Sequence, residues 1–268
     1  MTPGAAGGRP PVLSPRARDA LGFVALVVGV AAVVPPLGSW ARHSLVADAL
    51  QASVLALVVP ALLALGAPWG HLGLAGGSGP ADRVAEARRR HPQLVRSLGF
   101  VVVDLAVIVW WRTPAAVDGV VRRGWLVVPE ALSLVVAGLA LWLECVESPP
   151  LRPRLAAPRR ALIAALAMWG VWTFAYVVGL SHVAWYRGFP HVAGRGLSAA
   201  ADQQLATAVL WAVAAAVFLP VIFWNLVGWL RAEEDPDDEL AALIRSERRA
   251  RPARPSAPPG TRGTPPDG

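Results

Sequence analysis

The sequence has no lysine, only one cysteine (Cys145) and two methionines in 268 residues. A single cysteine cannot form an internal disulfide, and no CxxC pair is present to hold a metal through thiolates. Met1 and Met168 are too few for a methionine-rich metal relay. Charged residues make up 16% of the chain, against about 25% in a typical soluble domain. This shortage of charge argues against a soluble globular protein.

Hydrophobic residues make up 55% of the chain, and the mean hydropathy is +0.47. They are gathered in blocks of about the 20 residues that a helix needs to cross a bilayer. The blocks cover residues 20–37, 44–67, 98–111, 125–143, 161–180 and 205–230. The third block can lengthen through Leu94 and Val95. The first block is followed by Trp40 and Arg42 without a small-residue cleavage site, which favours an uncleaved helix over a signal peptide. The pattern predicts an all-α polytopic membrane bundle of about six transmembrane helices.

The ends of the chain differ from the blocks in composition. Residues 1–19 are rich in proline, glycine and arginine and are expected to be a disordered cytoplasmic arm. Residues 20–231 form the predicted transmembrane bundle. Residues 232–268 begin with acidic residues, contain a short amphipathic stretch around Leu240–Ile244, and become proline-rich, which predicts a mostly disordered cytoplasmic tail.

All 25 basic residues other than histidine are arginines, and they are unevenly divided between the two sides of the predicted membrane. With six spans, 19 arginines lie on the side of both termini and six on the other side. Because basic loops stay in the cytoplasm, both termini are expected on the cytoplasmic side of a bacterial plasma membrane. Arginines placed between apolar blocks indicate membrane topology rather than binding to nucleic acid.

Several polar residues fall inside or at the outer ends of the spans, where ionisable groups are costly and are usually paired or functional. They are Asp48, Arg112, Glu130, Asp202, Gln203 and Gln204, all expected in the outer third of the bundle. Two interpretations are open. The residues could form a structural ion-pair network in which Arg112 neutralises Asp48 or Glu130. They could instead form a ligand or metal site.

Asp104 lies deeper, in the third span, and is expected to be protonated or hydrogen-bonded to Gln51 or Ser53. None of the five histidines lies in the middle of a span, so a haem or metal site within one helix is not expected. His182 and His191 in the last outer loop, beside Tyr186, are weak candidates for metal ligands. The chain has no phosphate loop, nucleophile elbow or zinc-protease motif, and we expect no enzyme activity.

Four stretches resemble the CtaG family of cytochrome c oxidase assembly factors. The first is PALLALGAP at residues 60–68, and the second is His91-Pro92 followed by WWRTP at residues 110–114. The third is EALSLVVAG at residues 130–138, with Trp142 after it. The fourth and most specific is DQQLATAVLW at residues 202–211, followed by WLR at residues 229–231.

The resemblance implies a protein that helps to mature the copper site of a respiratory terminal oxidase, with oxidase subunits as partners. Copper is the implied metal, and imidazole is its natural ligand in such a site. However, the positions that match the family's histidines hold Asp48, Ala52, Arg112 and Ala131. The sequence therefore predicts that an ion pair replaces the metal site. A small-solute or ion transporter that uses Asp48, Asp104, Glu130 and Arg112 is the alternative, although no internal repeat supports it.

Overall fold

The computed structural model describes residues 13–75, 79–90, 94–151, 153, 155–186, 188–189 and 198–233. These residues form helices and no strand, which confirms the all-α prediction. The chain divides into two units, residues 1–227 and residues 228–268. The first unit holds the bundle. In the second unit the described residues are 228–233, the last turns of helix α10.

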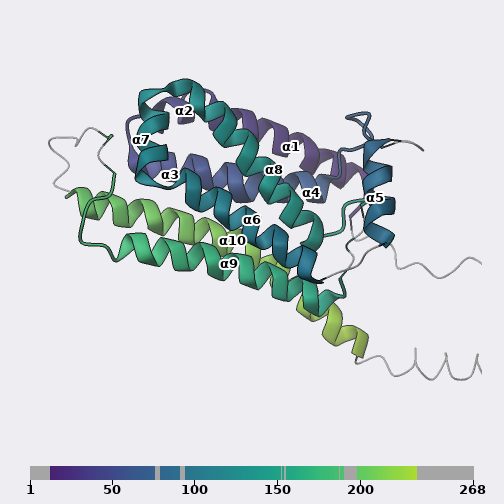
Figure 1. The fold of residues 1–268 in the computed structure, drawn as a ribbon. Helices are drawn as coiled ribbons and strands as arrows, with labels where there is room; N and C mark the ends of the chain where they lie inside the picture. The colour runs from purple at the N-terminus through teal and green to yellow at the C-terminus, as the bar shows by residue number, and fades with distance from the viewer. Residues whose placement is uncertain are drawn as a thin grey trace, which may run out of the picture. The chain divides into compact units, whose positions relative to one another are not determined.

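Six helical stretches are long and apolar enough to cross a membrane, as predicted. The chain is a multi-pass membrane protein (Figure 1). The spans are built in chain order from α1 (Pro15–Val33) with α2 (Leu37–Trp40), α3 (Leu45–Ser53) with η1 (Val54–Val58) and α4 (Val59–Gly66), α6 (Leu94–Trp111), η2 (Gly124–Leu126) with α8 (Val127–Cys145), α9 (Ala157–Gly179), and α10 (Ala199–Glu233).

The structure differs from the sequence prediction in the connections and at the first boundary. The loops after the second and third spans contain helices α5 (Pro80–Arg90) and α7 (Pro114–Arg122), which the hydropathy pattern does not show. Helix α1 begins at Pro15, inside the predicted arm, because the Ser14 hydroxyl accepts a hydrogen bond from the Ala17 N–H at 3.3 Å. A serine N-cap followed by proline is a strong start signal for a helix. The rest of the arm, residues 1–12, and the tail from residue 234 lie outside the described residues.

The second span is the most buried of the six. Of its most apolar window 67% is buried, against 17% for the first span and 22% for the sixth. Its middle is a π-helical turn, η1, in which the Val59 N–H reaches back to the Val54 carbonyl. Pro60 has no N–H to donate to Ala56, so the regular α-helical ladder cannot continue there.

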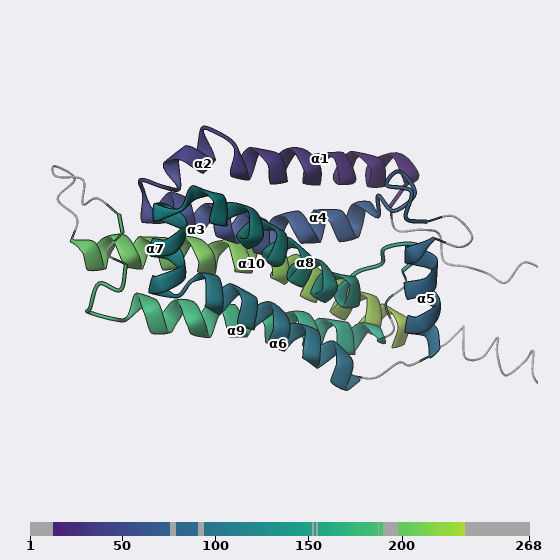
Figure 2. The ribbon, with the colours of Figure 1, turned by 45° about the horizontal axis from the view of Figure 1, so that its top comes forward.

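Helix α8 packs closely against this irregular turn. A Cβ atom added at Gly138 would collide with the Ala56 carbonyl oxygen and with the Pro60 ring. Glycine therefore lets the two backbones approach one another, which small residues commonly do between membrane helices. Helices α1 and α4 lie side by side in Figures 1 and 2. A glycine allows a close approach here too, because a Cβ atom at Gly66 would collide with the Gly22 backbone.

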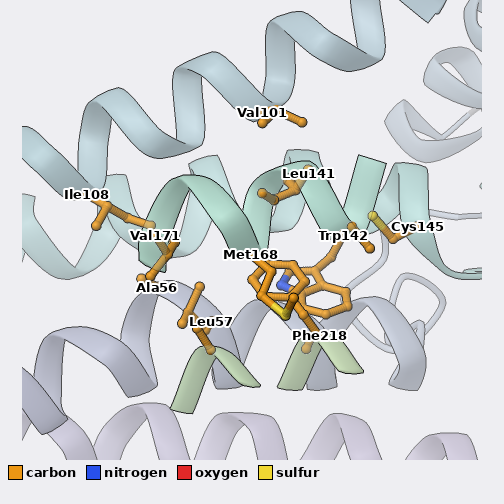
Figure 3. Packing of buried hydrophobic residues seen from close by; sticks show 14 of the residues in the cluster. Ala56, Leu57, Val101, Ile108, Leu141, Trp142, Cys145, Met168, Val171 and Phe218 are labelled. Atoms are coloured by element: carbon orange, nitrogen blue, oxygen red, sulfur yellow. The ribbon is translucent and has the colours of Figure 1, made fainter. Parts of the chain in front are cut away.

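The core continues along α8, α9 and α10 toward the ends of the spans that carry most of the arginines. The rings of Trp142 and Phe218 are stacked with centroids 4.9 Å apart and an interplanar angle of 13°. Figure 3 shows these rings with Met168 beside them, between Leu57 and Cys145. Without a hydrophobic driving force in lipid, close packing of this kind is what holds the helices together.

Candidate functional site

Asp48 and Arg112 form an ion pair inside the bundle. Asp48 lies in the first turn of α3, which Ser44 caps, and Arg112 directly follows the last residue of α6. An Nη atom of Arg112 donates to an Oδ atom of Asp48 at 2.5 Å, and the side chains are only 7% and 5% exposed. The predicted pairing of Arg112 with a carboxylate of a neighbouring span is therefore present. A charge-assisted contact of this kind offsets the cost of burying each charge.

Tyr186 also contacts Arg112. Its hydroxyl donates to the backbone carbonyl of Arg112 at 2.8 Å, and the guanidinium carbon lies 5.7 Å from the centre of its ring. Burial raises the pKa of the Tyr186 phenol above its ordinary value, so the hydroxyl keeps the proton that it donates. The sequence marks Tyr186 only as a neighbour of His182 in the outer loop, because nothing local shows that this loop folds over Arg112.

Glu130 lies in the first turn of α8 and is 4% exposed. It is within electrostatic range of both Asp48 and Arg112, while the hydrogen-bonded ion pair of Arg112 is with Asp48. The adjoining turn is fixed to the third span, because the Trp111 indole donates to the Ser133 hydroxyl at 2.7 Å. Ser133 in turn donates to the Pro129 carbonyl at 2.7 Å.

The three consecutive polar residues of the sixth span separate into different environments. Gln203 is 1% exposed and uses both ends of its amide. Its nitrogen donates to the carbonyls of Val178 at 2.9 Å and Val183 at 3.3 Å, and its oxygen accepts from the Trp185 N–H at 2.8 Å. Gln203 therefore joins α10 to the end of α9 and to the outer loop. Asp202 is partly exposed and Gln204 is exposed, and no hydrogen bond among the described residues links either of them to the Asp48–Arg112 pair.

Helix α7 packs with residues 181–186 and 188–189 beside the ion pair. The Asp118 carboxylate accepts a hydrogen bond from the Gly188 N–H at 2.9 Å, which ties the helix to this segment. Val117 of α7 packs with Leu45 and Phe189 in a small apolar cluster that also includes Tyr186. The apolar positions of α7 and its starting proline could have indicated a helix in this loop, but not what it covers.

A small cavity of about 20 Å³ lies next to Arg112. Its polar lining comes from Arg112, Ser53, Tyr186 and Thr207, and the rest is apolar. A space of this size accommodates about one water molecule. Immediately beside Arg112 the described residues are therefore closely packed.

The residues present do not suit a copper ion. Asp48 already binds a guanidinium, whose positive charge opposes a cation, and no described histidine joins it in a metal-binding group. Within the described ranges no three histidine, cysteine, aspartate or glutamate residues form a group that could hold a metal. His182 is exposed, and His191 lies outside the described residues. Cys145 is buried at the other end of α8, about 22 Å from Glu130 at 1.5 Å per residue.

Asp104 does not make the contacts that the sequence suggests. The Gln51 amide donates to the Ala32 carbonyl at 2.7 Å, and the Ser53 hydroxyl donates to the Ala49 carbonyl at 2.6 Å. Both polar groups are thus used within or beside their own span. Asp104 is 1% exposed, and neither of its carboxyl oxygens has a hydrogen-bond partner among the described residues. The predicted bond to Gln51 or Ser53 is wrong, and protonation stays a prediction.

These features define a polytopic helical membrane protein in which a buried aspartate–arginine pair joins the second and third spans at one end of the bundle. The chain belongs to the cytochrome c oxidase caa3 assembly factor family (Caa3_CtaG), whose model matches residues 7–232. This match confirms the resemblance seen in the four sequence stretches. No curated protein and no solved structure matches the chain.

Proposed function

We propose that this protein assists the assembly of a respiratory terminal oxidase in a bacterial plasma membrane. The observation that carries the proposal is the match to the assembly factor family over residues 7–232, which includes all six spans. Families of this kind generally act without catalysis, in agreement with the lack of a catalytic motif in the sequence. The partners are then oxidase subunits within the same bilayer.

The assembly role does not involve copper bound at the outer polar level. Arg112 occupies the position of a family histidine and pairs with Asp48, which occupies the position of another. The pair joins the second and third spans, and α7 packs beside it with residues 181–186 and 188–189. What this level offers a client is a folded outer surface rather than a metal ion.

Deletion of the gene tests the assembly role. We expect loss of terminal oxidase activity and of oxidase copper, restored by the wild-type gene. The same purified protein in proteoliposomes should show no flux of ions or small solutes. Unchanged oxidase activity in the deletion strain, together with measurable flux, would favour the transporter alternative.

Copper binding tests the second part of the proposal. Purified wild-type protein should retain less than one copper per chain after a mild chelator wash, because Asp48 is paired and no imidazole lies beside it. A matched variant that carries histidine at positions 48, 52, 112 and 131 tests whether the family pattern alone restores binding. Stoichiometric copper on the wild-type protein would contradict the proposal and direct attention to His182, His191 or Cys145.

Fusion reporters test the membrane orientation, for which the arginine asymmetry is the support. Reporters fused after residue 9 and after Arg231 should report the cytoplasm, and one inserted near residue 194 should report the outside. A reporter after Arg231 that is found outside would exclude the six-span arrangement with both termini in the cytoplasm.

A further inference from the structure

The ends of the spans opposite the Asp48–Arg112 pair surround a second and larger pocket. It has a volume of about 380 Å³, within the usual size range of small-molecule sites. Its walls come from the start of α1, the end of α4, the end of α8 with the segment that follows it, the start of α9, and residues 220–225 of α10. All of these residues belong to the first unit of the chain.

Two arginines from distant spans line this pocket. Arg18 is on the first turn of α1, and Arg160 is on the first turn of α9. The Nε atoms of both side chains are buried and have no hydrogen-bond partner among the described residues. Glu147 supplies the acidic group of the lining and lies within electrostatic range of Arg160. Two guanidinium groups against one carboxylate leave an excess positive charge.

The remaining walls are mostly apolar. They include Leu21, Leu65, Val221 and Trp224, and Trp224 is also 64% exposed. The Asn225 amide is already engaged, because its nitrogen donates to the carbonyls of Val221 at 2.8 Å and Cys145 at 3.3 Å. The pocket therefore combines unsatisfied cationic donors with an apolar surface.

We propose that this pocket binds an anionic phospholipid, with its phosphate on Arg18 and Arg160 and an acyl chain along the apolar wall. Guanidinium groups bind phosphate oxygens with charge-assisted hydrogen bonds, which would use the two buried Nε–H donors. Basic pockets between transmembrane helices on the cytoplasmic side bind such headgroups elsewhere, and the arginine count places these helix ends on that side. Both arginines also lie at helix N-termini, where the helix dipole favours an anion.

Native mass spectrometry of the full-length protein tests the proposal. The detergent-solubilised protein is offered equal amounts of dioleoyl phosphatidylglycerol and dioleoyl phosphatidylcholine. An arginine near a membrane surface contributes about fivefold to the binding of an anionic lipid, so two should give a preference for phosphatidylglycerol of at least about tenfold. Equal retention of both lipids by the wild-type protein would overturn the proposal without any variant.

A matched pair of double variants locates the preference. Arg18→Gln with Arg160→Gln should reduce it to near unity. Arg16→Gln with Arg159→Gln removes the same charge from two neighbouring exposed positions and should leave it unchanged. An equal loss of the preference for phosphatidylglycerol in both double variants would show attraction to general surface charge and would contradict the proposed site.

Two further measurements separate a lipid from other occupants. Excess inorganic phosphate should not displace the bound lipid, because it lacks the acyl chain that contacts Leu65 and Val221. Displacement by phosphate alone would mean a simple anion site. A dimer that forms without bound lipid and hides Trp224 from a fluorescence quencher would mean that a second copy covers the pocket. Either result would overturn the proposal.

Discussion

Arginine is used differently at the two ends of this bundle. At the end that carries α7, Arg112 is 6% exposed, its guanidinium pairs with Asp48, and its carbonyl accepts from Tyr186. At the opposite end Arg18 and Arg160 line an open pocket and keep an Nε–H group without a partner in the described part of the chain. The Arg112 guanidinium has a partner within the protein, whereas Arg18 and Arg160 each keep a donor without one among the described residues. An internally satisfied charge stabilises one structure, and an unsatisfied one favours a ligand.

Removal of the outer guanidinium should have the largest effect on stability. Arg112→Ala leaves Asp48 buried without a partner and should lower the free energy of unfolding by about 3–5 kcal/mol. Adding Asp48→Asn should restore part of the loss, because the unpaired charge disappears. Reversible unfolding in mixed micelles measures both changes. Arg122→Ala, at an exposed position, is the control, and an equal loss there would show that Arg112 has no special role.

The second largest effect on stability is expected where α8 packs against the second span. Gly138→Ala places a methyl group against the Ala56 carbonyl and the Pro60 ring, neither of which can move far. We expect a loss of about 1–3 kcal/mol in the same unfolding assay, as for other overpacked positions. Gly99→Ala on α6 meets no atom within 4 Å and should be nearly neutral. Alanine forms helix more readily than glycine at both positions, so similar losses in both variants would contradict the role of the close approach of α8.

Removal of the Tyr186 hydroxyl should have a smaller effect on stability. Tyr186→Phe keeps the ring against the guanidinium but removes the hydroxyl that donates to the Arg112 carbonyl. The expected loss is about 1 kcal/mol, the usual net value of one hydrogen bond. Tyr176→Phe is the matched control, because Tyr176 is 56% exposed. A change of similar size in both variants would contradict the role of the Tyr186 hydroxyl.

The smallest effect should come from the inner arginines when no lipid is present. Arg18→Gln with Arg160→Gln should change the free energy of unfolding by less than about 0.5 kcal/mol in lipid-free micelles, because neither Nε–H group has a hydrogen-bond partner to lose among the described residues. Added phosphatidylglycerol should stabilise the wild-type protein but not this double variant, because only a ligand that binds the folded state raises its stability. A large loss in lipid-free micelles would mean that the inner arginines are paired internally, like Arg112.

Part of the outer site could be predicted from the sequence and part could not. Asp48 and Arg112 are recognisable because charges inside apolar blocks require partners, and the order of the spans makes neighbours of their outer ends. The role of Tyr186 was missed, because it depends on a loop folding back over a residue far away in the chain. Asp202 and Gln204 were grouped with the pair by depth alone, and depth does not determine which face of a helix a residue occupies.

The sequence by itself determined the six spans, and it favours the orientation proposed for them, because hydropathy and arginine distribution act on each segment locally. Only the tertiary structure decided that the second span lies deepest, that Asp104 has no described partner, and that Arg18 and Arg160 line one pocket. These features arise from contacts between spans far apart in the chain. Such contacts depend on side-chain packing, on close approaches such as that at Gly138, and on the turn of each helix about its axis.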